Sequence, residues 1–129
     1  MRILHLNTER SWRGGERQTF WLAEALARRG HDSRLACRPE GPLAARAKER
    51  GIVVFPLSPL FEFDPLAVSR LRRYMRESGT EILQAHTGHA VGLGALAARG
   101  MGAKLVVTRR VDFPLKADFF SLSEVHLKI

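Results

Sequence analysis

The sequence predicts an α/β fold: a three-layer, Rossmann-like domain built on a parallel sheet with strand order 3-2-1-4-5. The first observation is that short apolar runs alternate with longer amphipathic segments along the chain, four times over. This alternation is typical of a parallel sheet covered by helices on both faces, with right-handed crossovers. The second is the length of 129 residues, which fits one domain with its own core.

The N-terminal elements show the pattern most clearly. Residues 3–6 (Ile-Leu-His-Leu) read as a buried strand, and residues 7–15 as a polar loop that contains glycine. Residues 16–29 predict a helix with an apolar face, Glu16 in its first turn and Gly30 as its stop. The remaining elements are expected at 34–37 (strand), 42–51 (helix), 52–55 (strand), 64–78 (helix), 82–85 (strand), 90–99 (helix) and 105–108 (strand).

The charge balance indicates an anionic partner. The chain has 21 Lys and Arg against 13 Asp and Glu, a formal net charge of +8. Such a balance favours a phosphorylated ligand, an anionic membrane face or nucleic acid, although genome composition also enriches arginine. Nucleic acid is the weakest of these, because no recognisable reader motif is present.

The cysteine count and the hydropathy exclude other classes. Cys37 is the single cysteine, so an internal disulfide framework and a cysteine-based zinc site are excluded. The first residues carry too short an apolar run for a signal peptide, and no run of about 18 apolar residues exists. We expect a cytoplasmic protein, peripheral at most on the inner face of the cell membrane.

A ligand is expected at the carboxyl ends of the strands, where the strand order reverses. With the predicted order this point lies between the first and fourth strands. The loops after the first, fourth and fifth strands are the most polar of the chain, and we expect them to converge there. They contain Gly14-Gly15-Glu16, His86-Thr87-Gly88-His89 and Arg109-Arg110-Val111-Asp112.

Gly14 and Gly15 precede a helix, which suits close approach of a phosphate to backbone N–H groups. The alternative is a plain glycine turn. Neither G-x-G-x-x-G nor a Walker A loop occurs, so NAD and ATP binding of those kinds are disfavoured.

His86 and His89 lie three residues apart, which raises the question of a metal site. We expect no metal, because no Asp or Glu lies near them in the sequence and two histidines are an incomplete ligand set. His86 is the candidate catalytic residue, since a neutral imidazole can bind a sugar hydroxyl or steady a leaving phosphate. Either histidine is alternatively a packed loop residue.

Arginines supply two further candidate sites. Arg109 and Arg110 suit a bidentate phosphate clamp, although Asp112 alternatively pairs with Arg109. The predicted 64–78 helix has an arginine face, which we expect to point outward as a solvated surface or as an anionic-membrane surface. This face consists of Arg70, Arg72, Arg73 and Arg76.

Three parts of the chain resemble glycosyltransferase family 4, of the GT-B fold. They are Gly14-Gly15-Glu16, the helix end Leu26-Ala27-Arg28-Arg29-Gly30-His31 and Ala85-His86. The resemblance covers about residues 1–115, as the N-terminal half of a GT-B architecture. It implies a retaining, metal-free and cofactor-free transfer from a nucleotide-sugar to a glycan or lipid-linked acceptor held by this domain.

The resemblance also assigns residue roles. Gly14, Gly15 and Glu16 would lie near the donor phosphates, and His86 would contact the transferring sugar. The sequence departs from the family where it has Gln84 and Arg110, positions at which the family often has histidine. Arg110 therefore puts the identity of the acceptor in doubt.

The family has a second, donor-binding domain that this sequence does not contain. We therefore expect a truncated chain that is inactive alone, with residues 116–129 as a tail or a non-native continuation. An open cleft would leave apolar residues uncovered and favour self-association. The residues concerned are Leu57, Leu60, Phe61 and Phe63. The alternatives are a non-catalytic basic module that binds a membrane or phosphorylated ligand, and a different small α/β enzyme.

Overall fold

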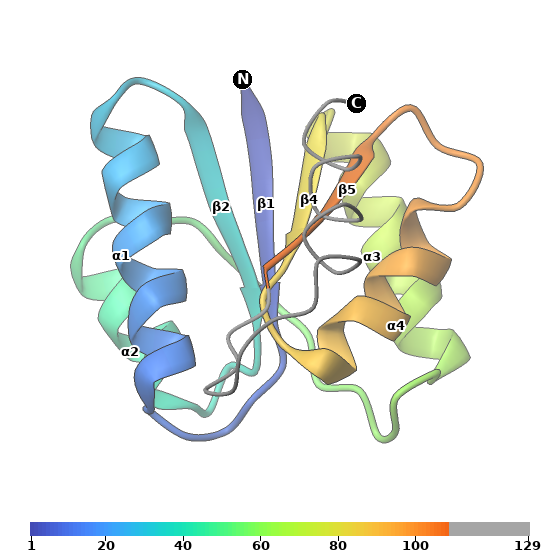
Figure 1. Cartoon of the computed structure of the whole chain (residues 1–129), viewed down its shortest axis with the longest axis horizontal. Helices are drawn as coiled ribbons and strands as arrows, with labels where there is room; N and C mark the ends of the chain where they lie inside the picture. The colour runs from blue at the N-terminus through green and yellow to red at the C-terminus, as the bar shows by residue number, and fades with distance from the viewer. Residues whose placement is uncertain (109–129) are drawn as a thin grey trace, which may run out of the picture.

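The computed structural model describes residues 1–108, which form a parallel five-stranded sheet between two pairs of helices. The strand order is β3-β2-β1-β4-β5, as predicted, and all four ladders are parallel. Figure 1 shows α1 and α2 on one face of the sheet and α3 and α4 on the other. The bounds in chain order are β1 (Arg2–Asn7), α1 (Gly14–Arg28), β2 (Asp32–Cys37), α2 (Pro42–Glu49), β3 (Val54–Pro56), α3 (Pro65–Ser78), β4 (Ile82–Ala85), α4 (Gly88–Ala98) and β5 (Lys104–Val107).

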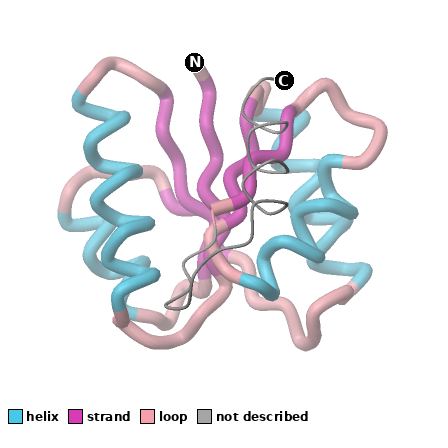
Figure 2. The backbone as a smooth tube through the Cα atoms, in the orientation of Figure 1, coloured by secondary structure: helices cyan, strands magenta, loops and turns pink. Residues whose placement is uncertain are grey.

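Helix ends follow local sequence signals. Asp64 is the N-cap of α3 and accepts hydrogen bonds from the Leu66 and Ala67 amides, while Pro65 occupies the first turn. Each of the four described helices is followed by a glycine with φ between 68° and 92°, a region that side chains disfavour. The chain therefore turns sharply back to the sheet after every helix (Figure 2).

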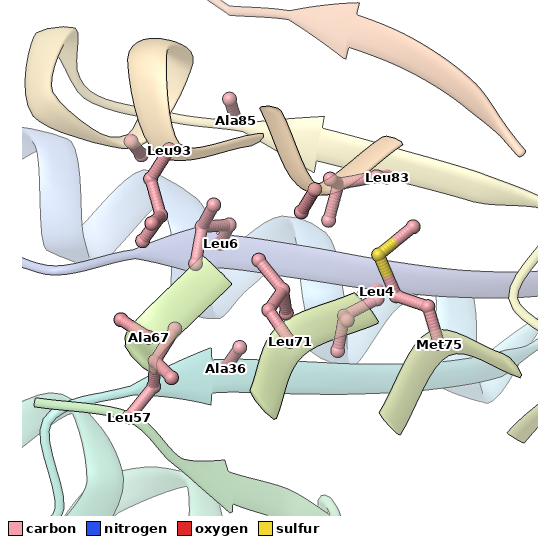
Figure 3. Close-up of a cluster of buried hydrophobic side chains, with 12 residues drawn as sticks. Leu4, Leu6, Ala36, Leu57, Ala67, Leu71, Met75, Leu83, Ala85 and Leu93 are labelled. Atoms are coloured by element: carbon pink, nitrogen blue, oxygen red, sulfur yellow. The ribbon is translucent and has the colours of Figure 1, made fainter. Parts of the chain in front are cut away.

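The core consists of two clusters, one on each face. Alternate residues of a strand point to opposite faces, and the even-numbered Leu4 and Leu6 of β1 face α3 and α4. Figure 3 shows them beneath Leu71 and Met75 of α3 and beside Leu83 of β4. On the other face, α1 and α2 bury a second apolar cluster against β2, which includes Phe20, Ala23, Leu35, Cys37, Leu43, Ala44, Ala47 and Ile52.

Several boundaries differ from the sequence expectation, among them the starts of the third strand and of two helices. The third strand begins at Val54, because Ile52 packs below α2 and Val53 is exposed, so these two residues belong to the connection. The first and last helices begin two residues earlier than expected, at Gly14 and Gly88, since their glycines already have helical backbone. Both helix N-termini therefore lie nearer the sheet edge than predicted.

Candidate functional site at the carboxyl edge of the sheet

A cavity of about 440 Å³ lies at the carboxyl edge of the sheet. Its lining comes from the β1–α1 loop, the β3–α3 loop and the start of α4. The residues are 8–11, Arg13, Arg38, 59–62, His89 and Leu93. Its walls therefore combine arginines, carboxylates and the exposed apolar side chains of Leu60 and Phe61.

This cavity tests the predicted crevice only in part. The loop after β1 lines it as expected, and the loop after β3, which was not predicted there, lines it as well. The loop after β4 contributes through His89, at the start of α4. Arg109, Arg110 and Asp112 lie outside the described residues, as does the 116–129 tail, so their roles stay predictions.

The β1–α1 loop is held by buried polar side chains. Asn7 Nδ2 donates to Thr19 Oγ1 at 3.0 Å, and Thr19 Oγ1 donates to the Gly15 carbonyl oxygen at 2.9 Å. Asn7 Oδ1 also accepts from the Glu9 amide at 3.0 Å. We did not predict this network from the sequence, although Asn7 is a polar residue at the end of an apolar strand.

Glu16 shapes the same loop from the helix side. It is buried, and its Oε1 accepts hydrogen bonds from the Arg13 amide at 2.9 Å and from Ser11 Oγ at 3.1 Å. Because the Arg13 amide precedes the helix, this contact is the glutamate half of a capping box. The described contacts of Glu16 therefore hold the loop, while its role near a donor phosphate stays a prediction.

Gly14 and Gly88 are the first residues of α1 and α4, and at both positions a side chain would fit. Neither has a positive φ, and a Cβ added to either would meet no atom within 4 Å. Neither backbone conformation nor packing among the described residues therefore requires glycine there. Both positions lie at helix N-termini, where free N–H groups favour anions.

A buried pair of histidines lies beneath this edge. His5 Nδ1 and His86 Nε2 are 3.1 Å apart, and His5 Nε2 is 3.1 Å from Ser33 Oγ. His5 is fully buried and His86 is only 3% exposed. Burial lowers the pKa of His5 to about 4, which keeps its ring neutral at pH 7. Of these three residues, only His86 was predicted from the sequence as a candidate site residue.

His89 has an acidic neighbour that the sequence analysis did not foresee. Glu62 Oε1 lies 3.7 Å from His89 Nδ1, because the β3–α3 loop packs against α4. The statement that no Asp or Glu lies near the two histidines is thus wrong in space, although right in sequence. No group of three or more metal-binding side chains occurs within residues 1–108.

Three of the four arginines predicted to face outward from α3 are exposed, namely Arg70, Arg73 and Arg76, whereas Arg72 is half-buried. Arg72 Nη1 donates to the carbonyl oxygens of Leu96, Ala97 and Arg99 at 2.6–3.3 Å and so closes the end of α4. Arg70 donates to the Pro56 carbonyl oxygen and covers the Phe55 ring. Arg73 pairs with Glu77 on the surface, and Arg76 is exposed.

The apolar β3–α3 loop also needs one correction. Leu57 is fully buried in the core between the sheet and α3, rather than uncovered. Leu60, Phe61 and Phe63 are exposed as expected, at 85%, 60% and 54%. The difference arises because Leu57 directly follows β3, where its amide still bonds to the Cys37 carbonyl oxygen.

The family assignment follows from a match that covers most of the chain. The family model described as Glycosyltransferase Family 4 matches residues 12–126. The chain belongs to this family. The match runs from the β1–α1 loop through the site and includes most of the 116–129 segment that the sequence analysis set apart.

Solved structures show the same fold at low sequence identity. HepE of Anabaena in complex with UDP has a TM-score of 0.68 and 20% identity, over 99% of this chain and 33% of that one. MurG of Acinetobacter baumannii has a TM-score of 0.73 and 16% identity, over 96% of this chain and 39% of that one. A Rickettsia africae glycosyltransferase has a TM-score of 0.73 and 17% identity, over 98% of this chain and 34% of that one.

This glycosyltransferase family 4 chain therefore spans about a third of the length of those structures, and it has the fold of one part of a GT-B enzyme. A comparison with curated proteins gave no match.

Gln84, where the family often has histidine, donates to Thr108 Oγ1 at 2.6 Å and so joins β4 to the end of β5. No helix within residues 1–108 is long and apolar enough to cross a membrane.

Proposed function

We propose that this chain is the N-terminal, acceptor-side domain of a retaining glycosyltransferase that uses a nucleotide-sugar without a metal ion. The family membership supports a transferase, and HepE has been solved with UDP and with UDP-glucose. The observation that carries the proposal is the position of Gly14 at the N-terminus of α1, where neither φ nor packing within residues 1–108 requires glycine. A ligand phosphate approaching the α1 N-terminus would explain it.

The acceptor would occupy the cavity between the β1–α1 and β3–α3 loops. Arg10 and Arg13 line it beside the exposed side chains of Leu60 and Phe61. A guanidinium binds phosphate or carboxylate, while the apolar rim suits an alkyl or prenyl segment. An anionic glycan or lipid-linked acceptor fits both features. His86 would act from beneath the same edge on the transferring sugar.

Transfer itself needs the rest of the cleft. Sugar transfer of this class depends on positioning and on stabilising the leaving diphosphate. This chain covers a third of its structural neighbours, so we propose that it binds a nucleotide-sugar weakly and does not turn it over alone. A pure preparation of this chain that transfers sugar would contradict this part of the proposal.

A pair of glycine variants tests the donor site. Gly14→Ala places a methyl group where the phosphate would approach, whereas Gly102→Ala places one at the opposite edge of the sheet. A Cβ at either position meets no atom of residues 1–108 within 4 Å and neither has a positive φ, so both variants should fold as the wild type does. In a nuclear magnetic resonance titration with UDP-glucose, we expect Gly14→Ala to weaken binding at least tenfold and Gly102→Ala to leave it unchanged. Equal affinities in all three proteins would remove Gly14 from the site.

A second candidate function is docking on an anionic membrane. The observation that favours it is a groove of about 610 Å³ that places Phe63, Val68 and Leu96 beside Arg73 and Arg76. The exposed Leu60, Phe61 and Leu66 lie close in sequence to its rim. Apolar side chains flanked by arginines suit a surface of anionic lipid headgroups.

Vesicle sedimentation tests the membrane surface. We expect the double variant Arg73→Gln/Arg76→Gln to reduce binding to phosphatidylglycerol vesicles several-fold. The matched control is Arg28→Gln/Arg29→Gln, which removes the same charge from exposed positions at the end of α1. An equal loss in both variants would show that only net charge matters, and unchanged binding would exclude this groove.

A further inference from the structure

The strongest unassigned feature is the buried polar chain that joins three strands. Ser33 of β2, His5 of β1 and His86, directly after β4, are linked by two contacts of 3.1 Å. All three side chains are buried, with exposures of 7%, 0% and 3%. Buried polar groups that are not satisfied cost free energy, so these contacts restrict the protons of the three side chains to few arrangements.

Counting protons leaves two possible arrangements for the hydrogen-bonded side chains of Ser33, His5 and His86. A neutral imidazole carries one N–H donor and one acceptor nitrogen. When His5 carries its proton on Nδ1, it donates to His86 Nε2, which puts the His86 proton on Nδ1. When His5 carries its proton on Nε2, it donates to Ser33 Oγ, and His86 Nε2–H donates to His5 Nδ1. The tautomer of His86 is thus coupled to that of His5.

We propose that His5 is a positioning residue, which together with Ser33 holds His86 in a single neutral tautomer and ring orientation. Three paired strands hold these side chains in place, since β1 pairs with β2 on one side and with β4 on the other. His86 therefore presents a fixed donor or acceptor to its surroundings. The importance of this for sugar transfer rests on the function proposed above, whereas the tautomer itself does not.

The low pKa of His5 supports the same role. Burial lowers it to about 4, so near pH 7 His5 stays neutral and keeps one donor and one acceptor. A protonated His5 would have two donors and would oppose any proton on His86 Nε2. Neutral His5 therefore preserves the coupling over the pH range in which free histidine titrates.

Two amide variants separate positioning from mere packing. His5→Asn keeps a polar atom close to the Nδ1 position, which faces His86, whereas His5→Gln carries its polar atoms toward the Nε2 position, which faces Ser33. Both substitutions replace a ring with an amide of similar polarity. They should therefore disturb the core about equally, but only His5→Asn can still contact His86 Nε2.

The experiment is ¹⁵N spectroscopy of the histidine rings in the 129-residue chain at pH 7. We expect a His86 tautomer preference of about tenfold or more in the wild type and in His5→Asn, because a lost buried hydrogen bond is costly enough to produce it. In His5→Gln we expect the preference to fall below about threefold. The same preference in both variants, or two tautomers of similar population in the wild type, would overturn the proposal.

Ser33→Ala keeps the test usable if the His5 variants do not fold. It removes the hydroxyl of Ser33, so we expect the ¹⁵N shifts of both rings to change, including that of His86, to which Ser33 is linked through His5. Shifts that change in His5 alone would contradict coupling. These readouts involve no nucleotide-sugar, so a failure of UDP-glucose binding would count against the proposed function and leave this inference standing.

Discussion

Arg38 Nε donates a hydrogen bond to the Thr8 carbonyl oxygen at 2.6 Å, and Nη2 of the same guanidinium donates to the Pro59 carbonyl oxygen at 2.9 Å. Thr8 belongs to the β1–α1 loop and Pro59 to the β3–α3 loop, the two walls of the candidate acceptor cavity. A single side chain after β2 therefore sets the distance between these walls. Its partial burial lowers the pKa of the guanidinium, which nevertheless stays charged near neutral pH.

Replacing Arg38 should loosen the cavity and the fold together. Arg38→Met keeps the apolar stem but removes both hydrogen bonds, so we expect a loss of about 1–2 kcal/mol in the free energy of unfolding, measured with urea. Arg17→Met removes the same charge from an exposed position on α1 and should change stability by less than about 0.5 kcal/mol. Equal stability of the two variants would mean that Arg38 does not tie the loops.

Gly92 controls how closely the β3–α3 loop packs against α4. A Cβ at Gly92 would lie 2.7 Å from Glu62 Oε2 and 2.8 Å from Phe63 Cε1, so Gly92→Ala must displace both side chains. Both are free to move, and alanine favours a helix by up to about 1 kcal/mol. We therefore expect unchanged or slightly raised stability, with altered chemical shifts for His89, which lies beside Glu62.

The control for this variant lies two residues further along the same helix. Gly94→Ala makes the same change in helix propensity, but its Cβ would contact Leu6, Leu83 and Leu105 of the sheet at 3.4–3.5 Å. It should leave the His89 signals unchanged. If both variants shift His89 alike, the cause is the helix as a whole rather than the loop contact.

Neighbouring arginines of α3 should differ sharply in their effect on stability. Arg72→Met leaves the carbonyl oxygens at the end of α4 without their donor, and we expect a loss of about 1–2 kcal/mol by thermal or urea unfolding. Arg73→Met breaks an exposed pair with Glu77, which is worth well under about 1 kcal/mol. A larger loss for Arg73→Met would refute the capping role of Arg72.

His5 should make the fold sensitive to acid between about pH 6.5 and pH 4. Its pKa is about 4 in the folded chain against 6.5 when exposed, so the unfolded state binds the additional proton within this window. Stability therefore falls as the pH falls, by about 2 kcal/mol from this residue between pH 7 and pH 5. Urea unfolding of the wild type and His5→Asn at both pH values measures the difference. A pH dependence that is the same in both proteins would show that His5 is not the source.

The fold was predictable because its signals are local and repeated. Strand–helix alternation, the Asp64-Pro65 start of α3 and the glycines after each helix fix the elements, and right-handed crossovers then leave few strand orders. Boundaries were less certain, as the early start of α4 shows, because glycine at a helix start carries no clear propensity signal.

The candidate site was predictable only where a residue's place in the sequence indicates its role. Gly14, Glu16 and His86 are glycine or polar residues that follow predicted strands. The role of Arg72 depends on the end of α4, a helix that follows in sequence, and the pairing of Glu62 with His89 depends on how two segments pack. His5 did leave a signal, a histidine within an apolar strand, but its partner is 81 residues away.

The most direct test of the account maps UDP-glucose onto the domain. Amide chemical shifts of the 129-residue chain would be followed during a titration to millimolar nucleotide-sugar, with UDP and glucose as separate controls. We expect saturable changes at residues 8–15 and 87–89, the β1–α1 loop and the start of α4. No saturable change, or changes confined to the opposite edge around Gly79 and Gly102, would contradict a nucleotide-sugar site at the carboxyl edge of the sheet.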